Sequence, residues 1–143
     1  MNKKKIAIIN GVNLNALGSR EVNIYGHVDF NSYFTELKTA FPACELSYFQ
    51  SNKIDEIIEQ LYQYQHFDAI ILNPGAYTHT SIILADAIKA IQAPVIEVHI
   101  SNLFGREQFR KNSLIAAACQ GSISGFGLSG YQMAIFSLLN HPL

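Results

Sequence analysis

Five short hydrophobic runs alternate with amphipathic segments along this 143-residue chain. Each run has the length and composition of a β-strand. The predicted strands are 5–9 (KIAII), 44–50 (CELSYFQ), 68–73 (DAIILN), 93–100 (APVIEVHI) and 121–127 (GSISGFG). The third run is apolar at successive positions, which is typical of a strand that is buried on both faces. The pattern therefore indicates a parallel sheet with helices on both sides.

Helices are predicted between these strands because apolar residues recur there at intervals of three and four. Asp29 is the expected N-cap of the first helix, and Pro42 ends it. Ser51 or Asn52 is the expected N-cap of the second helix, which continues through Leu61. The first helix is thus predicted over about 29–41, and two more helices are predicted over about 78–91 and 129–139.

The alternation of strand and helix, with a polar turn in place of a helix after strand 4, predicts an α/β fold of the flavodoxin-like type. We expect a three-layer sandwich around a five-stranded parallel sheet in the order 2-1-3-4-5, formed by a single domain over residues 1–143. No internal repeat or linker interrupts the pattern. In such a sheet the ligand site lies beyond the carboxyl ends of the strands, near the switch point between strands 1 and 3.

Composition excludes several classes of protein. The net charge is −1, which gives no electrostatic basis for binding nucleic acid. The Lys3–Lys5 run is followed by only four apolar residues, too few for a signal peptide or a membrane span, so we expect a soluble cytoplasmic protein. Cys44 and Cys119 lack partners at metal-ligand spacing and are expected to be core residues. Charged residues make up only 15% of the chain, which hints that other subunits cover part of the surface.

Three polar loops follow strands 1, 3 and 4, and they should meet at one edge of the sheet. Their sequences are NGVNLNALGSREVNIYG, NPGAYTHTS and SNLFGREQFR. A flavin mononucleotide site is disfavoured because the first loop is long, rich in Asn and carries Arg20. A phospho-accepting receiver domain is disfavoured because Asn10 and Asn73 stand where that site needs acidic residues.

Candidate acid and base groups lie in and just after strands 3 and 4. His99 is near the end of strand 4, and Glu97 lies on the same face of that strand, where it can hold the imidazole tautomer. A structural, hydrogen-bonded His99 is the alternative. His79 is placed at a helix start, which disfavours its protonated form and suits it to bind substrate by a hydrogen bond. Asp86 lies two turns further along and either orients His79, binds a hydroxyl or is simply solvated.

The first loop offers a second proton-transfer pair, Arg20 and Tyr25. A nearby guanidinium stabilises a phenolate, so this pair can abstract a proton; the alternative is two unrelated surface residues. We expect residues 14–27 to form a lid, with Gly18 and Gly26 as hinges.

The order of six short motifs resembles one family. GVNLNALGSRE followed by IYG, then FQSN, LNPGAYTHTS, PVIEVHISN, REQFR and GFGLSGY occur in the order found in type II 3-dehydroquinate dehydratases. The resemblance runs from about Ile6 to Leu139. It implies a lyase of the shikimate pathway that dehydrates 3-dehydroquinate to 3-dehydroshikimate through an enolate-like intermediate. It also implies no metal and no cofactor, and trimers arranged into a homododecamer.

The resemblance also implies a role for each motif residue. Tyr25 is expected to be the base, with Arg20 stabilising its phenolate, and His99 is expected to be the general acid. Asn13 is expected to hold a water at the enolate oxygen, and Glu97 to support His99. The residues expected to bind substrate are Asn73, His79, Asp86, the backbone amides of Ile100 and Ser101, and Arg110; Arg106 is a neighbouring alternative to Arg110.

This chain departs from the family pattern at four positions outside the proposed acid and base. Val12 and Val22 stand where the family usually has Pro, and Phe104–Gly105 replaces a His–Ala pair. These changes bear on loop rigidity and substrate affinity rather than on the reaction. Two alternatives to an enzyme stay open at this point: a catalytically inactive relative that binds an anionic metabolite, and an interaction module without a small-molecule site.

Overall fold

The computed structural model describes residues 2–18 and 28–141 of the chain, and its centre is a five-stranded parallel sheet. The strand order is β2-β1-β3-β4-β5. All four neighbouring pairs run parallel, which confirms the predicted order. The strands are β1 (Lys4–Asn10), β2 (Cys44–Gln50), β3 (Ala69–Asn73), β4 (Val95–His99) and β5 (Gly121–Ser124).

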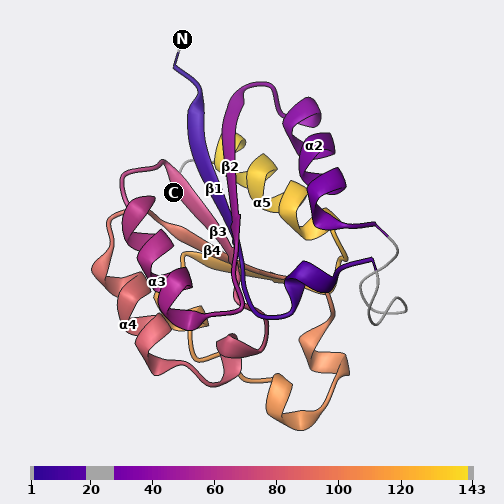
Figure 1. The fold of residues 1–143 in the computed structure, drawn as a ribbon, viewed down its shortest axis with the longest axis vertical. Coiled ribbons are helices and arrows are strands. Elements are labelled where there is room, and N and C mark those ends of the chain that lie inside the picture. The colour runs from indigo at the N-terminus through magenta and orange to yellow at the C-terminus, as the bar shows by residue number, and fades with distance from the viewer. Residues whose placement is uncertain (1, 19–27, 142–143) are drawn as a thin grey trace.

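Helices cover both faces of the sheet and form the outer layers of the predicted sandwich. They are α2 (Phe30–Ala40), α3 (Ile54–Gln63), α4 (Ile82–Ala90) and α5 (Ser129–Asn140). Helices α2 and α5 pack on one face, and α3 and α4 pack on the other (Figure 1). Parallel strands need crossover connections; α2, α3 and α4 lie in three of them, and together with α5 they bury both faces of the sheet.

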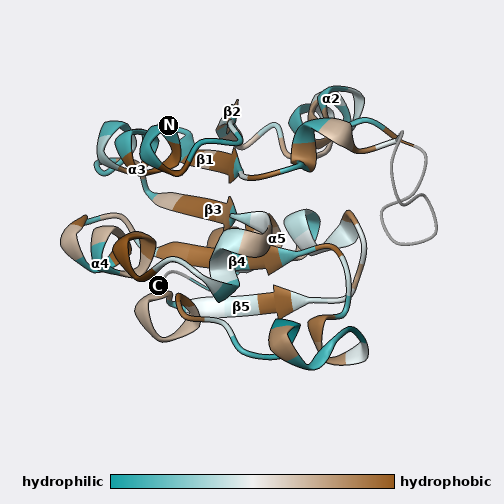
Figure 2. Cartoon of the chain, turned by 60° about the horizontal axis from the view of Figure 1, so that its bottom comes forward, coloured by the Kyte–Doolittle hydropathy of each residue, from teal (hydrophilic) through white to brown (hydrophobic). Residues whose placement is uncertain are grey.

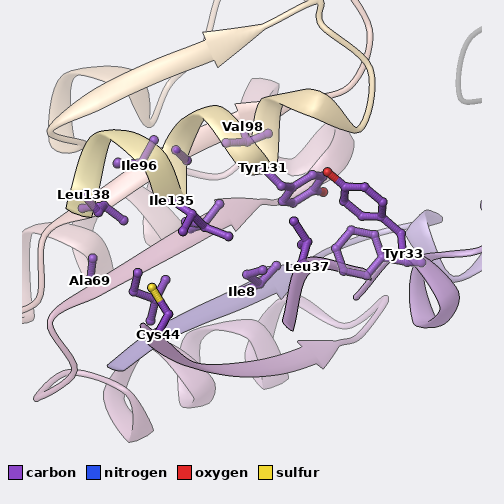
Figure 3. Packing of buried hydrophobic residues seen from close by; sticks show 14 of the residues in the cluster. Ile8, Tyr33, Leu37, Cys44, Ala69, Ile96, Val98, Tyr131, Ile135 and Leu138 are labelled. Atoms are coloured by element: carbon purple, nitrogen blue, oxygen red, sulfur yellow. The ribbon is translucent and has the colours of Figure 1, made fainter. Parts of the chain in front are cut away.

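The core divides into two clusters because strand side chains alternate between the two faces of the sheet. On β1, Ile6 and Ile8 belong to the cluster under α2 and α5, while Ala7 and Ile9 belong to the cluster under α3 and α4. All four residues are fully buried. Figure 2 shows β1, β3 and β4 largely in the colour of hydrophobic residues, with hydrophilic positions on the outer helices. Figure 3 shows α5 directing side chains, among them that of Tyr131, toward the sheet.

Two predicted helix starts are wrong, and both errors come from polar side chains that have other partners. Helix α3 begins at Ile54 with Lys53 as N-cap, because the Ser51 hydroxyl accepts from the Lys53 N–H outside the helix and bonds Glu56. Helix α4 begins at Ile82 and is capped by Ser81. The segment Gly75–His79, predicted in part as helix, is a 3₁₀ turn. The Asp29 cap of α2 is confirmed, since its side chain accepts from the Ser32 N–H.

The loops at the carboxyl edge are built from short 3₁₀ turns. They span Leu14–Ala16, Gly75–His79, Leu103–Gly105 and Gln108–Arg110, and a further 3₁₀ turn, Ala116–Ala118, leads into the start of β5. Most of the predicted lid, residues 19–27, lies outside the described residues. In the described part of the chain, no helix has the length and apolar character needed to cross a membrane.

Candidate active site

The turns after β1 and β3 pack against each other and form the floor of the site. Asn10 and Asn73 are partners in the register of the two strands, and the Gly11 N–H donates to the Asn73 carbonyl at 2.7 Å. A Cβ on Gly11 would lie 2.5 Å from the Pro74 carbonyl oxygen. Gly75 has φ +64°, and a Cβ there would lie 2.6 Å from the Val12 carbonyl oxygen. Glycine at both places lets the two backbones touch.

A pocket of about 160 Å³ opens over this floor. Seven of the residues predicted to form the site line it: Asn13, Asn73, His79, His99, Ile100, Ser101 and Arg110. Leu14, Leu17 and Leu103 form an apolar wall. The pocket thus has the character of a small-molecule site, with a few polar groups converging over an apolar surface.

A neutral network, which we call the amide–phenol network, lies behind the floor and consists of Asn10, Asn73 and Tyr131. Tyr131 donates its hydroxyl to Asn10 Oδ1 at 2.7 Å and accepts from Asn73 Nδ2 at 2.9 Å. Burial raises the pKa of Tyr131 well above its ordinary value, so the phenol keeps its proton. Asn73 Oδ1 accepts from the Gly75 N–H, so the second Nδ2 hydrogen and one lone pair of Oδ1 are left for a ligand.

A charged network, which we call the carboxylate network, surrounds Glu97 on β4. Its other members are His99, Thr78, Ser113 and Ser122. Ser113 Oγ donates to Glu97 Oε2 at 2.8 Å, and Ser122 Oγ donates to Oε1 at 2.9 Å. Burial acts to raise the pKa of Glu97, yet the hydrogen bond and charge of His99 and the hydroxyls of Thr78 and Ser113 outweigh it and lower the pKa to about 2. Glu97 is therefore a carboxylate although it is only 1% exposed.

The carboxylate network sets the tautomer of His99. Nε2 of His99 lies 2.5 Å from Glu97 Oε2, and an ionised carboxylate can only accept, so Nε2 carries a hydrogen. Nδ1 is then the nitrogen that is left to exchange a proton with a ligand. A proton on Nδ1 makes an imidazolium in contact with the Glu97 carboxylate. The sequence prediction that Glu97 and His99 act as a pair is consistent with this geometry.

His79 lies at the end of a 3₁₀ turn and not at the start of a helix, so the helix-dipole argument for its neutral form does not hold. A direct contact replaces it: His79 Nδ1 lies 2.7 Å from the Asn112 carbonyl oxygen and must be the donor. In the neutral ring, Nε2 is then an acceptor for a ligand hydroxyl.

Two arginines give the pocket its positive charge. Arg106 Nη1 donates to Ser101 Oγ at 3.2 Å, and Arg110 Nε donates to Glu107 Oε2 at 2.7 Å. The sequence alone left Arg106 and Arg110 as alternatives, and both line the pocket. Two guanidinium groups in one small pocket favour an anionic ligand.

Four predicted site residues are not among those that line this pocket, and one of them, Glu97, contacts it only through His99. Asp86 is exposed on α4 and is not among the residues that line the pocket. Arg20 and Tyr25 lie outside the described residues. Within residues 2–18 and 28–141, no group of three or more His, Cys, Asp and Glu side chains is placed to hold a metal ion.

Comparison with known proteins identifies the family that shares this sequence and fold. Residues 4–139 match the family model "Dehydroquinase class II". The chain belongs to the class II dehydroquinase family. Its relatives include 3-dehydroquinate dehydratases of Caldicellulosiruptor bescii, 50% identical over 139 residues that cover 94% of this chain and 96% of the relative, and of Clostridium perfringens, 49% identical over 141 residues that cover 96% and 97%. The crystal structure of a type II dehydroquinase from Butyrivibrio crossotus superposes with a TM-score of 0.93 at 40% identity, covering 96% of this chain and 99% of the other.

Sequence reasoning missed several polar residues that support the dehydroquinase site. Thr78, Ser113 and Ser122 lie far from Glu97 along the chain, and Tyr131 reaches Asn10 from 121 residues away. Single Ser, Thr and Tyr residues carry no local signal of such contacts. A polar residue on the core face of a predicted helix, as Tyr131 is on α5, was the one usable sign.

Proposed function

We propose that this chain is a type II 3-dehydroquinate dehydratase, a lyase that removes water from 3-dehydroquinate to give 3-dehydroshikimate in the shikimate pathway. The single observation that carries the proposal is the Glu97–His99 pair facing a small pocket with two arginines. Membership of the class II dehydroquinase family and the names of the relatives support the same reaction.

His99 is the general acid in this proposal. Loss of water from the substrate requires a proton on the departing hydroxyl, and Nδ1 of the His99 imidazolium supplies it. Glu97 accepts from the ring Nε2–H and holds the ring in one orientation. Although Glu97 is buried, it accepts three hydroxyl bonds besides its bond with the imidazole, so it stays ionised throughout.

Tyr25 is the proposed base, which takes the proton next to the ketone and so generates an enolate-like intermediate. Arg20 stabilises the Tyr25 phenolate, and Asn13 holds a water at the enolate oxygen. Tyr25 and Arg20 are assigned from the motif IYG and the preceding SRE, and Asn13 also lines the pocket. The loop 14–27 is proposed to act as a lid that excludes water during the reaction.

Substrate binding follows the charges and hydrogen-bonding groups of the pocket. The carboxylate of 3-dehydroquinate is proposed to contact the backbone amides of Ile100 and Ser101 and the guanidinium of Arg110. His79 Nε2 and the second Nδ2 hydrogen of Asn73 are proposed to bind its hydroxyls, since His79 Nδ1 and the first Nδ2 hydrogen of Asn73 already have partners. No cofactor takes part in this proposal.

Asp86 keeps its proposed role in substrate binding only if a second copy of the chain supplies it. It lies outside its own pocket, on a helix whose neighbouring residues Ile82 and Ile83 are 67% and 58% exposed. Exposed isoleucines of this kind favour burial against another subunit. A homo-oligomer, with the trimer-based dodecamer as its expected form, is therefore part of the proposal. Cytoplasmic location is proposed too, and the free thiols of Cys44 and Cys119 suit a reducing compartment.

The decisive experiment adds 3-dehydroquinate to the purified protein and follows the ultraviolet absorbance of the conjugated enone that dehydration creates. A rise for the wild type and its loss in Tyr25→Phe, with substrate still raising the melting temperature of that variant, is the expected result. A folded wild-type protein that binds 3-dehydroquinate but gives no enone would instead identify an inactive binding protein.

A further inference from the structure

The segment Phe49–Asn52 (FQSN) has no role in the proposed reaction, yet it holds the turn that carries Asn13. In the sheet order, β1 lies between β2 and β3, so the turn after β1 lies between the turns that follow its two neighbours. The Gly11 N–H binds the Asn73 carbonyl on the β3 side. On the β2 side, Gln50 Nε2 donates to the Gly11 carbonyl at 3.3 Å, and the Ser51 N–H donates to the Asn10 carbonyl at 3.1 Å.

Asn13 adopts an unusual backbone conformation at the end of this turn. Its φ is 67° and its ψ is 2°, and it is the one non-glycine residue with positive φ among those the structure describes. The left-handed region is disfavoured for residues with a Cβ, and Asn tolerates it better than most. Since Asn13 lines the pocket, this conformation decides where its side-chain amide points.

One side chain fixes that conformation from outside the turn. The Asn13 N–H donates to Asn52 Oδ1 at 2.9 Å. Gln50 Nε2 donates to the same oxygen at 3.2 Å, and the Asn52 carbonyl accepts from the Tyr77 hydroxyl at 2.6 Å. Asn52 is therefore held from two sides while it holds Asn13.

We propose that Asn52 is a positioning residue, which fixes Asn13 in its left-handed conformation so that the Asn13 amide faces the reacting part of the substrate. The inference rests on the proposed function, in which Asn13 acts at the enolate oxygen. Asn52 touches no substrate and acts only through the Asn13 backbone. Its loss therefore lowers kcat, whereas KM, which depends on groups elsewhere in the pocket, changes little.

The test compares Asn52→Ala with Asn52→Asp. Alanine removes the acceptor, and we expect kcat to fall about fivefold, as for the loss of one hydrogen bond that holds a minor backbone conformation. Aspartate keeps an acceptor for both the Asn13 N–H and Gln50, and because position 52 is exposed its charge is hydrated. We expect Asn52→Asp to restore most of kcat, with any repulsion of the anionic substrate appearing in KM.

Two further variants separate this role from a general effect on the turn. Asn13→Gly removes the amide, and glycine adopts positive φ without strain, so adding Asn52→Ala to it should lower kcat no further. Tyr77→Phe removes the bond to the Asn52 carbonyl but leaves its side chain in place, and should keep kcat near that of the wild type. Equal losses in Asn52→Ala with and without Asn13→Gly would overturn the inference, as would an unchanged kcat in Asn52→Ala.

A measurement without substrate keeps this inference separate from the proposed function. Hydrogen exchange of the Asn13 backbone N–H should be faster in Asn52→Ala than in the wild type and in Asn52→Asp, because this N–H loses its acceptor. Equal exchange rates in all three proteins would show that Asn52 does not hold the Asn13 backbone N–H. If the wild type fails to dehydrate 3-dehydroquinate, the proposed function fails, and the exchange data still decide whether Asn52 anchors Asn13.

Discussion

The two buried polar networks at the carboxyl edge of the sheet differ in charge and in their access to the pocket. The amide–phenol network of Asn10, Asn73 and Tyr131 is neutral, and Tyr131 binds both amides at the centre of it. The carboxylate network contains an ion, Glu97, and ends in an imidazole nitrogen at the pocket. At the same edge of the sheet, a neutral network therefore supports the floor of the pocket, and a charged network supports His99, the proposed general acid.

This difference in charge predicts that one network acts on stability and the other on catalysis. A closed neutral network fixes the positions of strand ends at any ordinary pH, because none of its groups changes charge there. A charged network that ends in a histidine at the pocket can orient that ring for transfer of a proton to a ligand. We expect disruption of the carboxylate network to affect catalysis most, and disruption of the amide–phenol network to affect stability most.

The largest effect is expected where the carboxylate network meets the substrate. His99→Asn keeps a polar side chain that can donate to Glu97 but cannot transfer a proton at neutral pH. We expect kcat to fall about 10²- to 10⁴-fold, the usual contribution of a general acid. Steady-state kinetics measures this, and a substrate-induced rise in melting temperature shows that the pocket still binds. A variant with more than a tenth of the wild-type kcat would contradict the assignment of His99 as the acid.

The next effect tests the charge of Glu97 apart from its shape. Glu97→Gln preserves size but places an amide among hydroxyl and imidazole donors, so at least one buried donor loses its acceptor. We expect the free energy of unfolding to fall by about 1–3 kcal/mol, and kcat to fall as well because the His99 ring loses its carboxylate partner. Urea unfolding and kinetics measure the two effects. Ser122→Ala, which removes one of the hydroxyl donors and leaves the charge, is the matched control and should retain most of kcat.

Acid should weaken the carboxylate network selectively. The pKa of Glu97 is lowered from an ordinary value of 4.5 to about 2 in the folded protein, so the unfolded chain takes up this proton first. The stabilisation is complete above about pH 4.5 and is lost as the pH falls toward 2, and it amounts to no more than about 3 kcal/mol. Urea unfolding across this range should show a steeper loss for the wild type than for Glu97→Gln. Parallel curves would mean that Glu97 is not the group responsible.

The smallest effect on turnover is expected from the amide–phenol network. Tyr131→Phe leaves the ring packed against α2 and the sheet but removes the partner of Asn10 Oδ1 and Asn73 Nδ2. We expect the free energy of unfolding to fall by about 1–3 kcal/mol while kcat stays within a fewfold of the wild type. Its acid unfolding should follow the slope of the wild type. A loss of kcat as large as that of Glu97→Gln would show that the two networks do not divide the work as described.

The sequence by itself determined the fold and predicted about half of the residues that line the pocket. Hydrophobic runs and turn residues predicted five strands in the observed order, because a parallel sheet buried on both faces leaves a continuous apolar pattern that few other folds share. The positions just after those strands predicted Asn73, His79 and the Glu97–His99 pair as one cluster. Each of these inferences uses local sequence together with one geometric rule about sheet edges.

Only the tertiary structure decided which polar groups have partners. In the folded chain the Thr78 hydroxyl binds Glu97 and does not cap a helix, and Ser81 caps α4. The side chain of Asn52 accepts from the backbone N–H of Asn13. The tertiary structure also placed Asp86 outside the pocket of its own chain. A hydrogen bond depends on atoms meeting within about 3 Å, and for residues tens of positions apart that distance is fixed by how the helices pack on the sheet, which no local pattern records.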